Sequence, residues 1–181
     1  MSTLRVNTLD GATGGGLITV ASGAAMYAPG STVQTLFARS GPTKQTISSA
    51  TPTAVTGLSV TITPKAASSI IYIQCQISTN AAWVASFGVF RDGAKTVSTS
   101  GFNNQNEDGM QFTIHDGSDV TSRLWCFPLM HYETAGSTTA RTYQVYATTA
   151  WQGSTRNLTI NDRDSSDMAS FSYMTVMEIA Q

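Results

Sequence analysis

Alternating hydrophobic and polar residues recur along most of this chain, and no stretch repeats at the 3.6-residue period of a helix. Leu58, Val60 and Ile62 fall on one side of an extended segment whose other side carries Ser59 and Thr61. A period of two residues is that of a half-buried β-strand. The pattern therefore predicts an all-β protein built from antiparallel strands.

Runs of Ser, Thr, Gly and Asn separate the segments that predict strands. These segments lie at residues 45–48, 55–63, 70–79, 82–91, 95–98, 123–133, 140–151, 158–160 and 171–180. Between two of them, Asp92-Gly93 predicts a hairpin, because this pair readily adopts the positive φ angles of a type I′ turn. Short strands at this spacing are typical of an antiparallel β-sandwich of jelly-roll type.

The last predicted strand, residues 171–180, carries apolar side chains on both faces. One face has Phe171, Tyr173, Thr175, Met177 and Ile179, and the other has Met174 and Val176. A strand that is covered on both sides belongs in the middle of a sheet or against a neighbouring subunit.

The first 38 residues have a different pattern. Short apolar alternations at residues 4–9 and 17–20 are divided by the glycine-rich run 11–16, which leaves too little apolar material for independent folding. We expect residues 1–38 to form an extended N-terminal attachment arm that orders by adding strands to a partner. Residues 39–181 would then form the β-sandwich head domain. The alternatives for the first segment are a loose leader or a first edge strand of the head.

Composition narrows the possible partners. Only 12% of the residues are charged and the net charge is −1, so the chain lacks the basic surface that binds nucleic acid or an anionic membrane. No segment has the roughly 20 apolar residues of a membrane-spanning helix, and no signal peptide is recognised at the N-terminus. A monomer usually carries about twice this charged fraction. We therefore expect part of the surface to be buried against other subunits.

The two cysteines, Cys75 and Cys126, lie in apolar strand-like runs. We expect both to be free and to behave as small hydrophobic residues. A disulfide is the less favoured interpretation, because assembly in a cytosol-like compartment disfavours it.

Several short motifs together resemble a known family. They are Leu58 to Pro64, Ser68 to Gln76, Arg91-Asp92-Gly93, the closing Val176 to Ile179, and the opening segments Ser2 to Asp10 and Pro29 to Gln34. In pattern and residue type, this series resembles the C-terminal β-domain of tailed-bacteriophage fibre and virion structural proteins.

The resemblance implies a non-enzymatic virion protein without cofactors, assembled in the host cytoplasm. It would be a short homotrimeric appendage, a tail fibre or a related part, that docks to other virion proteins through its arm. Its head would be exposed for attachment to a glycan or protein of the host surface. The alternative is a capsid decoration or cement protein that bridges coat subunits, and the lack of length for a fibre shaft keeps this alternative open.

A polar segment between residues 101 and 109 is the candidate surface recognition loop. It contains Asn103, Asn104, Gln105, Asn106, Glu107 and Asp108. These side chains suit the recognition of sugar hydroxyls, and no apolar residue among them anchors the loop in a core. The alternative is a solvated connection between strands.

Other constellations favour a structural interpretation. His115, Asp116 and Ser118, with His131 and Glu133 further on, lack the Gly-x-Ser-x-Gly motif of a hydrolase and the ligand spacing of a zinc site. We therefore expect no enzymatic activity and no bound metal. The segment 161–167 alternates oxygen ligands, but Asx capping of a turn explains it better than a calcium loop.

Six aromatic residues are candidates for a sugar-stacking platform, although core or interface packing is favoured for each of them. They are Trp83, Trp125, Tyr132, Tyr143, Tyr146 and Trp151.

Overall fold

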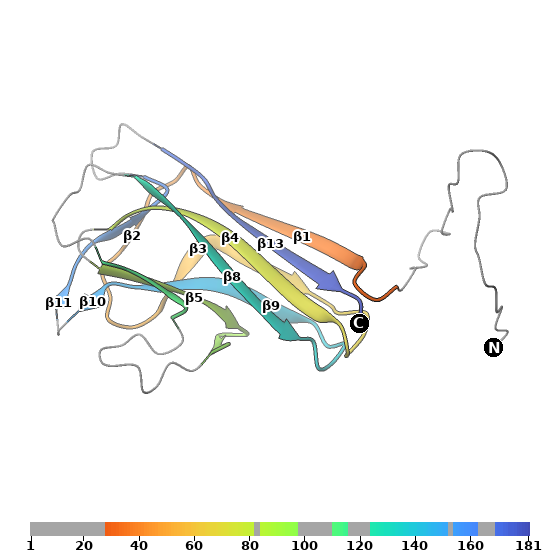
Figure 1. Ribbon diagram of the computed structural model, residues 1–181. Helices are drawn as coiled ribbons and strands as arrows, with labels where there is room; N and C mark the ends of the chain where they lie inside the picture. The colour runs from red at the N-terminus through yellow and green to blue at the C-terminus, as the bar shows by residue number, and fades with distance from the viewer. Residues whose placement is uncertain (1–27, 82–83, 98–109, 116–123, 152–153, 163–168) are drawn as a thin grey trace, which may run out of the picture.

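The computed structural model describes residues 28–81, 84–97, 110–115, 124–151, 154–162 and 169–181. All regular secondary structure in these ranges is β-strand, and most of it belongs to two antiparallel sheets in one elongated body (Figure 1). The predicted all-β, antiparallel architecture is therefore confirmed.

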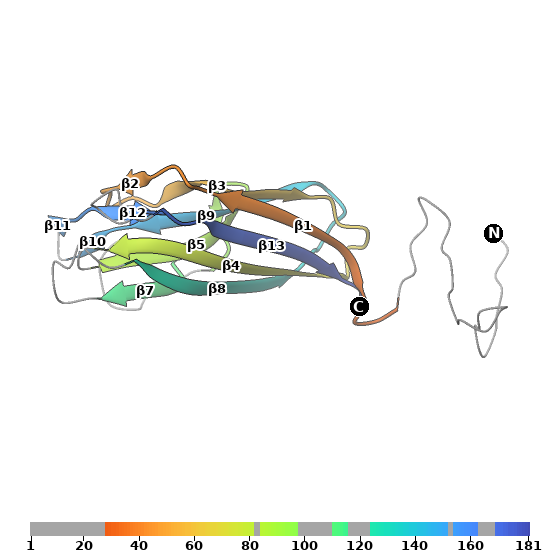
Figure 2. The same ribbon diagram turned by 90° about the horizontal axis from the view of Figure 1, so that it is seen from above.

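The first sheet contains six strands in the order β1–β13–β4–β12–β2, with β8 paired to the opposite edge of β4. Their bounds are β1 (Thr32–Ser40), β2 (Gln45–Ile47), β4 (Ile70–Ala81), β8 (Trp125–Thr134), β12 (Leu158–Ile160) and β13 (Ser172–Ile179). Figure 2 shows β1, β13, β4 and β8 following one another across this sheet. The last strand thus lies in the middle of a sheet, between β1 and β4, as its two apolar faces predict.

The second sheet has the order β3–β9–β5, and two short strands share the remaining edge of β5. Its strands are β3 (Thr53–Ile62), β5 (Val84–Arg91), β6 (Ala94–Lys95), β7 (Phe112–His115) and β9 (Arg141–Thr148). The strands β10 (Ala150–Trp151) and β11 (Ser154–Thr155) pair only with each other among the described strands. Four of the strand pairs are β1 with β13, β3 with β9, β4 with β8 and β5 with β7.

The two sheets pack face to face around a common core. Leu58, Val60 and Ile62 of β3 are buried while Ser59 and Thr61 are exposed, which confirms the predicted alternation. The core cluster also contains Ile71, Ile73, Cys75, Ile77, Leu129, Met174 and Val176 from the first sheet, and Phe87, Val89, Tyr143 and Val145 from the second. Apolar side chains that alternate along strands of both sheets therefore meet in a single interior.

A tight hairpin joins β5 to β6 at the predicted position. Asp92 and Gly93 have φ angles of 52° and 78°, both in the left-handed region that a type I′ turn requires. Arg91 pairs with Ala94 across this turn. The Asp-Gly prediction is thus confirmed, and the turn sets the register of the hairpin.

The cysteines are both free, but they lie in different surroundings. Cys75 is buried in β4, and this burial raises the pKa of its thiol to about 12. Cys126 is exposed, because it occupies an outward position on β8, which among the described strands pairs only with β4. The expectation of a small buried hydrophobic residue thus holds for Cys75 and is wrong for Cys126.

The first strand of the described chain begins beside the C-terminus. Gly30 donates a backbone hydrogen bond to Ala180 at 2.8 Å, and the Ala180 amide donates to Ser31 at 2.9 Å. From there β1 pairs with β13 to its end at Ser40. Residues 32–38, expected in the arm, thus lie in the first sheet, and residues 1–27 lie outside the described residues.

The core position Leu58 and its exposed neighbour Ser59 give a matched test of this layering. We expect Leu58→Ala to lower the free energy of unfolding by about 2–5 kcal/mol, because it removes packed atoms and leaves a cavity. Ser59→Ala should change it by about 0.5 kcal/mol or less. Urea unfolding followed by circular dichroism measures both values. Equal costs for the two substitutions would contradict the assignment of faces.

Candidate functional site

The predicted recognition loop, Asn103 to Asp108, lies outside the described residues, but the structure describes the chain up to residue 97 and again from residue 110. Thr96 donates its hydroxyl to the Val89 carbonyl at 2.6 Å. Gln111 donates its backbone amide to Phe87 at 2.8 Å, and its Oε1 accepts from the Val89 amide at 2.9 Å. Both ends of the connection are therefore fastened to β5.

The histidine that suggested a hydrolase or zinc site is part of a hydrogen-bond network. His131 is buried on β8, and its Nδ1 lies 2.8 Å from Nε2 of Gln111. Because Oε1 of Gln111 accepts from Val89, its amide nitrogen faces the imidazole, so Nδ1 is the acceptor. Asp116 and Ser118 lie outside the described residues. The structure thus brings His131 and Glu133 together, and the side chain of His115 also lies outside what it describes.

Glu133 on β8 joins the first sheet to the second. Its Oε1 lies 2.7 Å from Nη1 of Arg91 and accepts a hydrogen bond from the Tyr143 hydroxyl. Arg141 Nη1 lies 4.0 Å from the same oxygen. Burial alone would raise the pKa of Glu133, but His131, whose Nε2 lies 3.9 Å from Oε2, and the hydrogen bonds from Tyr143 and Arg91 lower it to about 2. These contacts make Glu133 a structural link between β8 and the strands β5 and β9.

The segment considered as a calcium loop begins with a buried capping residue. Asn161 has a φ of 65° and donates Nδ2 to the Ser40 hydroxyl at 3.0 Å. Its Oδ1 accepts from Ser172 at 2.6 Å, so this oxygen already has a partner. Residues 163–168 lie outside the described residues. For Asn161 itself, the contacts are those of a turn fixed between β1 and β13.

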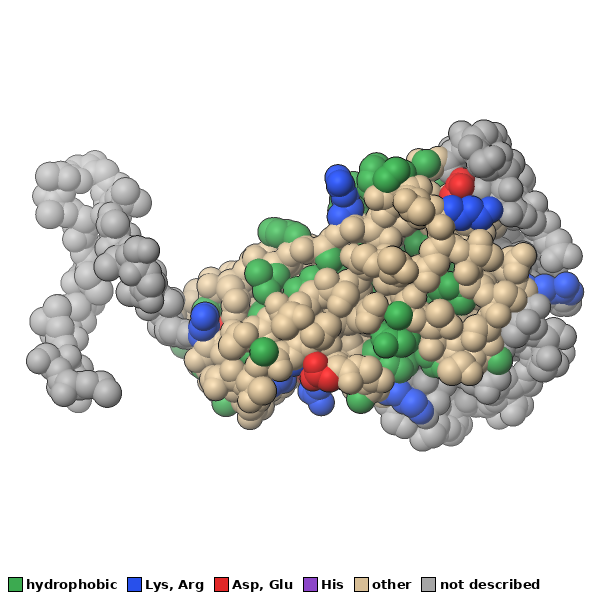
Figure 3. Space-filling model, turned by 180° about the vertical axis from the view of Figure 1, so that it is seen from behind, with side chains coloured by type: hydrophobic (Ala, Val, Ile, Leu, Met, Phe, Trp, Pro, Cys, Tyr) green, Lys and Arg blue, Asp and Glu red, His purple; other side chains and the backbone are tan. Residues whose placement is uncertain are grey.

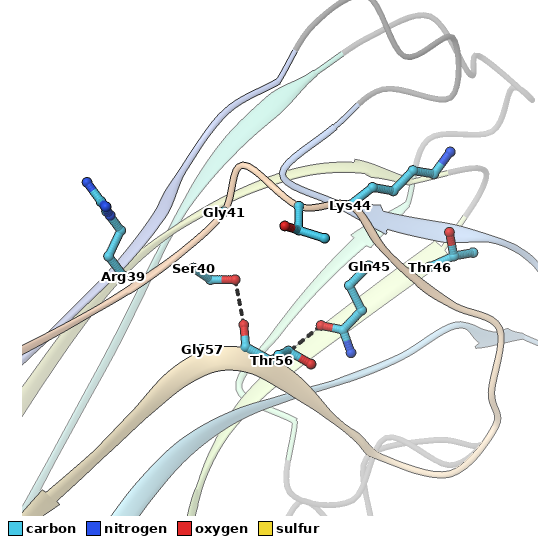
Figure 4. A pocket seen from close by; sticks show the side chains of 9 residues that line it. Arg39, Ser40, Gly41, Lys44, Gln45, Thr46, Thr56 and Gly57 are labelled. Carbon is cyan, nitrogen blue, oxygen red and sulfur yellow. Dashed lines mark hydrogen bonds between the residues drawn. The ribbon is translucent and has the colours of Figure 1, made fainter.

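A pocket of about 520 Å³ opens where the end of β1 meets β2 and β3. Gln45 in its wall is already engaged, because its Oε1 accepts from the Thr56 amide at 2.8 Å and its Nε2 donates to Ala54 at 2.9 Å. Arg39 and Lys44 point away from one another (Figure 4). The pocket therefore lacks the convergent polar groups of a specific ligand site.

The outer face of the first sheet is the most unusual surface in the described part of the chain. Four large apolar side chains are strongly exposed on it: Phe37 at 75%, Tyr132 at 71%, Met130 at 59% and Tyr173 at 47%. The pairing registers place Phe37, Thr175, Gln74 and Met130 in one row across β1, β13, β4 and β8. The next row contains Thr35, Met177, Tyr72 and Tyr132. We call this surface, formed by the outward side chains of these four strands, the outer apolar face.

The outer face of the second sheet has a different chemistry. Ser59 pairs with Gln144, and the hydroxyls of Thr61 and Thr142 are hydrogen-bonded at 2.8 Å. Figure 3, which views one side of the sandwich from behind, shows a surface with few and scattered charged groups. The large apolar side chains exposed in the described part of the chain lie on β1, β8 and β13 of the first sheet. The molecule is therefore asymmetric, with one apolar sheet face and one hydroxyl-rich sheet face.

The aromatic residues predicted as candidates divide between these environments. Tyr143 is fully buried, and Tyr146 stacks on Phe90 with 4.3 Å between ring centroids. Tyr132 and Trp125 are exposed. The side chain of Trp151 and the whole of Trp83 lie outside what the structure describes. Sequence reasoning missed Phe37, because Leu36 and Phe37 are adjacent in Thr32–Ser40 and alternation does not tell which of them faces outward.

Comparison with known proteins gives no assignment. Neither protein-family models nor curated protein sequences match this chain. Among the described residues, no group of three or more His, Cys, Asp or Glu side chains is placed to hold a metal ion. The same part of the chain contains no helix that is long and apolar enough to cross a membrane. Function is therefore inferred from the residues and their arrangement.

The link at Glu133 predicts a specific pH dependence of stability. Because its pKa falls from an ordinary value near 4.5 to about 2 on folding, the ionised carboxylate stabilises the fold above pH 4.5. That contribution is lost as the pH falls toward 2. We expect Glu133→Gln to destabilise the protein at pH 7, with a difference from the wild type that narrows between pH 5 and pH 2. Urea unfolding at a series of pH values measures this difference, and a gap that stays constant would contradict the link.

Proposed function

We propose that this chain is a non-enzymatic structural protein of a bacteriophage virion. It is a short trimeric appendage of the fibre type, docked to the particle by its N-terminal segment, with a β-sandwich head exposed for attachment to the host surface. The outer apolar face carries this proposal, because a soluble protein rarely leaves such a surface uncovered. A subunit of an assembly covers it with neighbouring subunits.

The strand pairing supports a head of jelly-roll type. Without the two- and three-residue strands, the described strands are β1, β3, β4, β5, β7, β8, β9 and β13. The outermost two of this series, β1 and β13, pair with each other, and so, moving inward, do β3 with β9, β4 with β8 and β5 with β7. Rolling up one long antiparallel hairpin produces this set of pairs. Jelly rolls are common in viral capsid proteins and lectins, which is a fold-level analogy and not evidence of a particular ligand.

The placement of the described termini supports attachment at one end of the head. Gly30 and Ser31 are hydrogen-bonded to Ala180, and the C-terminus lies at the end opposite β10 and β11 (Figures 1 and 2). A segment that leads to Ala28 can therefore reach a docking partner from that end while the other end stays exposed. With β1 assigned to the sheet, residues 1–27 remain for this docking role.

Bridging of coat subunits by a decoration or cement protein is the second candidate. A broad apolar face also suits a protein that lies flat on a coat. The two candidates differ in the position of the protein on the particle, which electron cryomicroscopy of intact virions locates directly.

Deletion of residues 1–27 tests the docking role. We expect the shortened chain to remain folded and β-rich, because every described strand is retained, and to be absent from assembled particles. Deletion of residues 1–38 is the contrasting variant, since it removes most of β1 and leaves one edge of β13 unpaired. That variant should lose stability or fail to fold. Normal incorporation of the chain without residues 1–27 would exclude attachment by this segment.

Replacement of Asn103 to Asp108 by Gly and Ser tests the recognition loop. We expect oligomer mass and thermal stability to stay the same while adsorption of particles to host cells weakens, because the replacement removes hydrogen-bonding side chains without changing the core. Thr138→Gly, in the exposed connection between β8 and β9, is the control. Unchanged adsorption would remove the recognition role, and loss of particle integrity would indicate a cement protein.

A further inference from the structure

We infer that the outer apolar face packs against a second copy of this chain and forms the subunit contact. The number of copies, three, rests on the proposed function. The location of the contact follows from the side chains of β1, β13, β4 and β8.

The first argument is the chemistry of the face. Its outward positions are Thr35, Phe37, Arg39, Ile70, Tyr72, Gln74, Gln76, Cys126, Pro128, Met130, Tyr132, Thr134, Tyr173, Thr175, Met177 and Ile179. Arg39 is the only charged residue among them, and its guanidinium lies 4.8 Å from the centroid of the Phe171 ring. Removing this face from water therefore buries apolar groups with almost no desolvation of charge.

The second argument is the relief of the face. Phe37 and Met130 are strongly exposed at the two edges of one row, with Thr175 between them, whereas Met177 and Tyr72 occupy the middle of the next row. Tyr72 donates its hydroxyl to Sδ of Met130 at 3.3 Å, which fixes the position of the Met130 side chain. Large and small side chains thus alternate across the face, so the side chains of a neighbour can interdigitate with them.

The third argument is size. Four strands about 4.8 Å apart and eight residues long, at about 3.3 Å per residue, cover roughly 500 Å² before the relief of the side chains is counted. This area is of the same order as the about 800 Å² that each partner contributes to a stable interface. Two such faces therefore reach the lower end of the size range of specific interfaces.

The fourth argument concerns the identity of the partner. A charged partner surface would leave its charges unpaired against this face, which is unfavourable. The other sheet of the described chain presents hydroxyl and amide groups, such as those of Ser59, Thr61 and Gln144. The large apolar side chains that are exposed in the described part of the chain all lie on the first sheet, so the outer apolar face of another copy is the surface that matches. In a trimer, each such face would meet a neighbour on either side of the three-fold axis. A second copy is therefore the occupant that this face fits.

Charge substitutions on the two outer faces test the inference. We expect Phe37→Glu and Met130→Glu each to raise the dissociation constant of the oligomer by about 100-fold or more, because a carboxylate would be buried without a partner. Ser59→Glu places the same charge on the second sheet and should leave assembly unchanged.

Size-exclusion chromatography with light scattering gives the mass of the oligomer, which should be three times 19.2 kDa for the wild type and for Ser59→Glu. The two outer-face variants should approach 19.2 kDa at micromolar concentration.

The outcomes separate this inference from the proposed function. A wild-type dimer that Met130→Glu dissociates would support the contact and contradict the trimer. A wild-type trimer that survives both outer-face substitutions would overturn the contact and leave the proposed function standing. A monomeric wild type would overturn the contact, while the docking and adsorption experiments would still decide the virion role.

A measurement on the unmodified protein covers the case in which a variant fails to fold. Hydroxyl-radical footprinting oxidises exposed Met, Tyr and Phe side chains and reads them by mass spectrometry. We expect Met130, Tyr132 and Phe37 to react several-fold more slowly than their exposure in a single chain implies, and to speed up when dilution dissociates the oligomer. Fast oxidation in concentrated wild-type protein would overturn the inference.

Discussion

The central constraint in this structure concerns β13, which pairs with β1 on one side and β4 on the other. One face of this strand is buried in the core between the two sheets. Ser172, Met174, Val176 and Glu178 all turn inward and are nearly inaccessible to water. Because side chains alternate along a strand, this inward set forces Tyr173, Thr175, Met177 and Ile179 to the opposite side. The core and the outer apolar face are therefore consequences of one register, and a shift of one residue would exchange them.

Polar residues fix this register at both ends of β13. Glu178 is buried, and burial alone would raise its pKa, but hydrogen bonds from Gln34 and from the backbone amides of Lys65 and Ala66 lower it. The Gln34 amide lies 2.6 Å from its carboxylate. At the other end, Asn161 holds Ser172 against the end of β1. A slipped strand would lose these partners and leave a carboxylate buried without them, which is unfavourable.

The sequence predicted the strands whose alternation is regular, including those around Leu58 and the final strand, and it predicted the Asp92-Gly93 turn. It did not predict β1 as a strand of the body, because its hydrophobic residues are few and an irregularity between Thr32 and Gln34 breaks the period. It also missed β7, a short strand beside polar residues. Leu36 and Phe37 are adjacent, and alternation alone does not tell which of them faces the core; the packing assigns Leu36 inward and Phe37 outward. The outer apolar face was for that reason visible only in the assembled sheet.

Electron cryomicroscopy of the purified protein tests the central claim most directly, because it shows both the symmetry and the surface in contact. The account predicts a closed trimer in which the outward side chains of β1, β13, β4 and β8 lie at the subunit contacts and the hydroxyl-rich face of the second sheet is exposed. Isolated single copies, or an assembly joined through the second sheet, would contradict it.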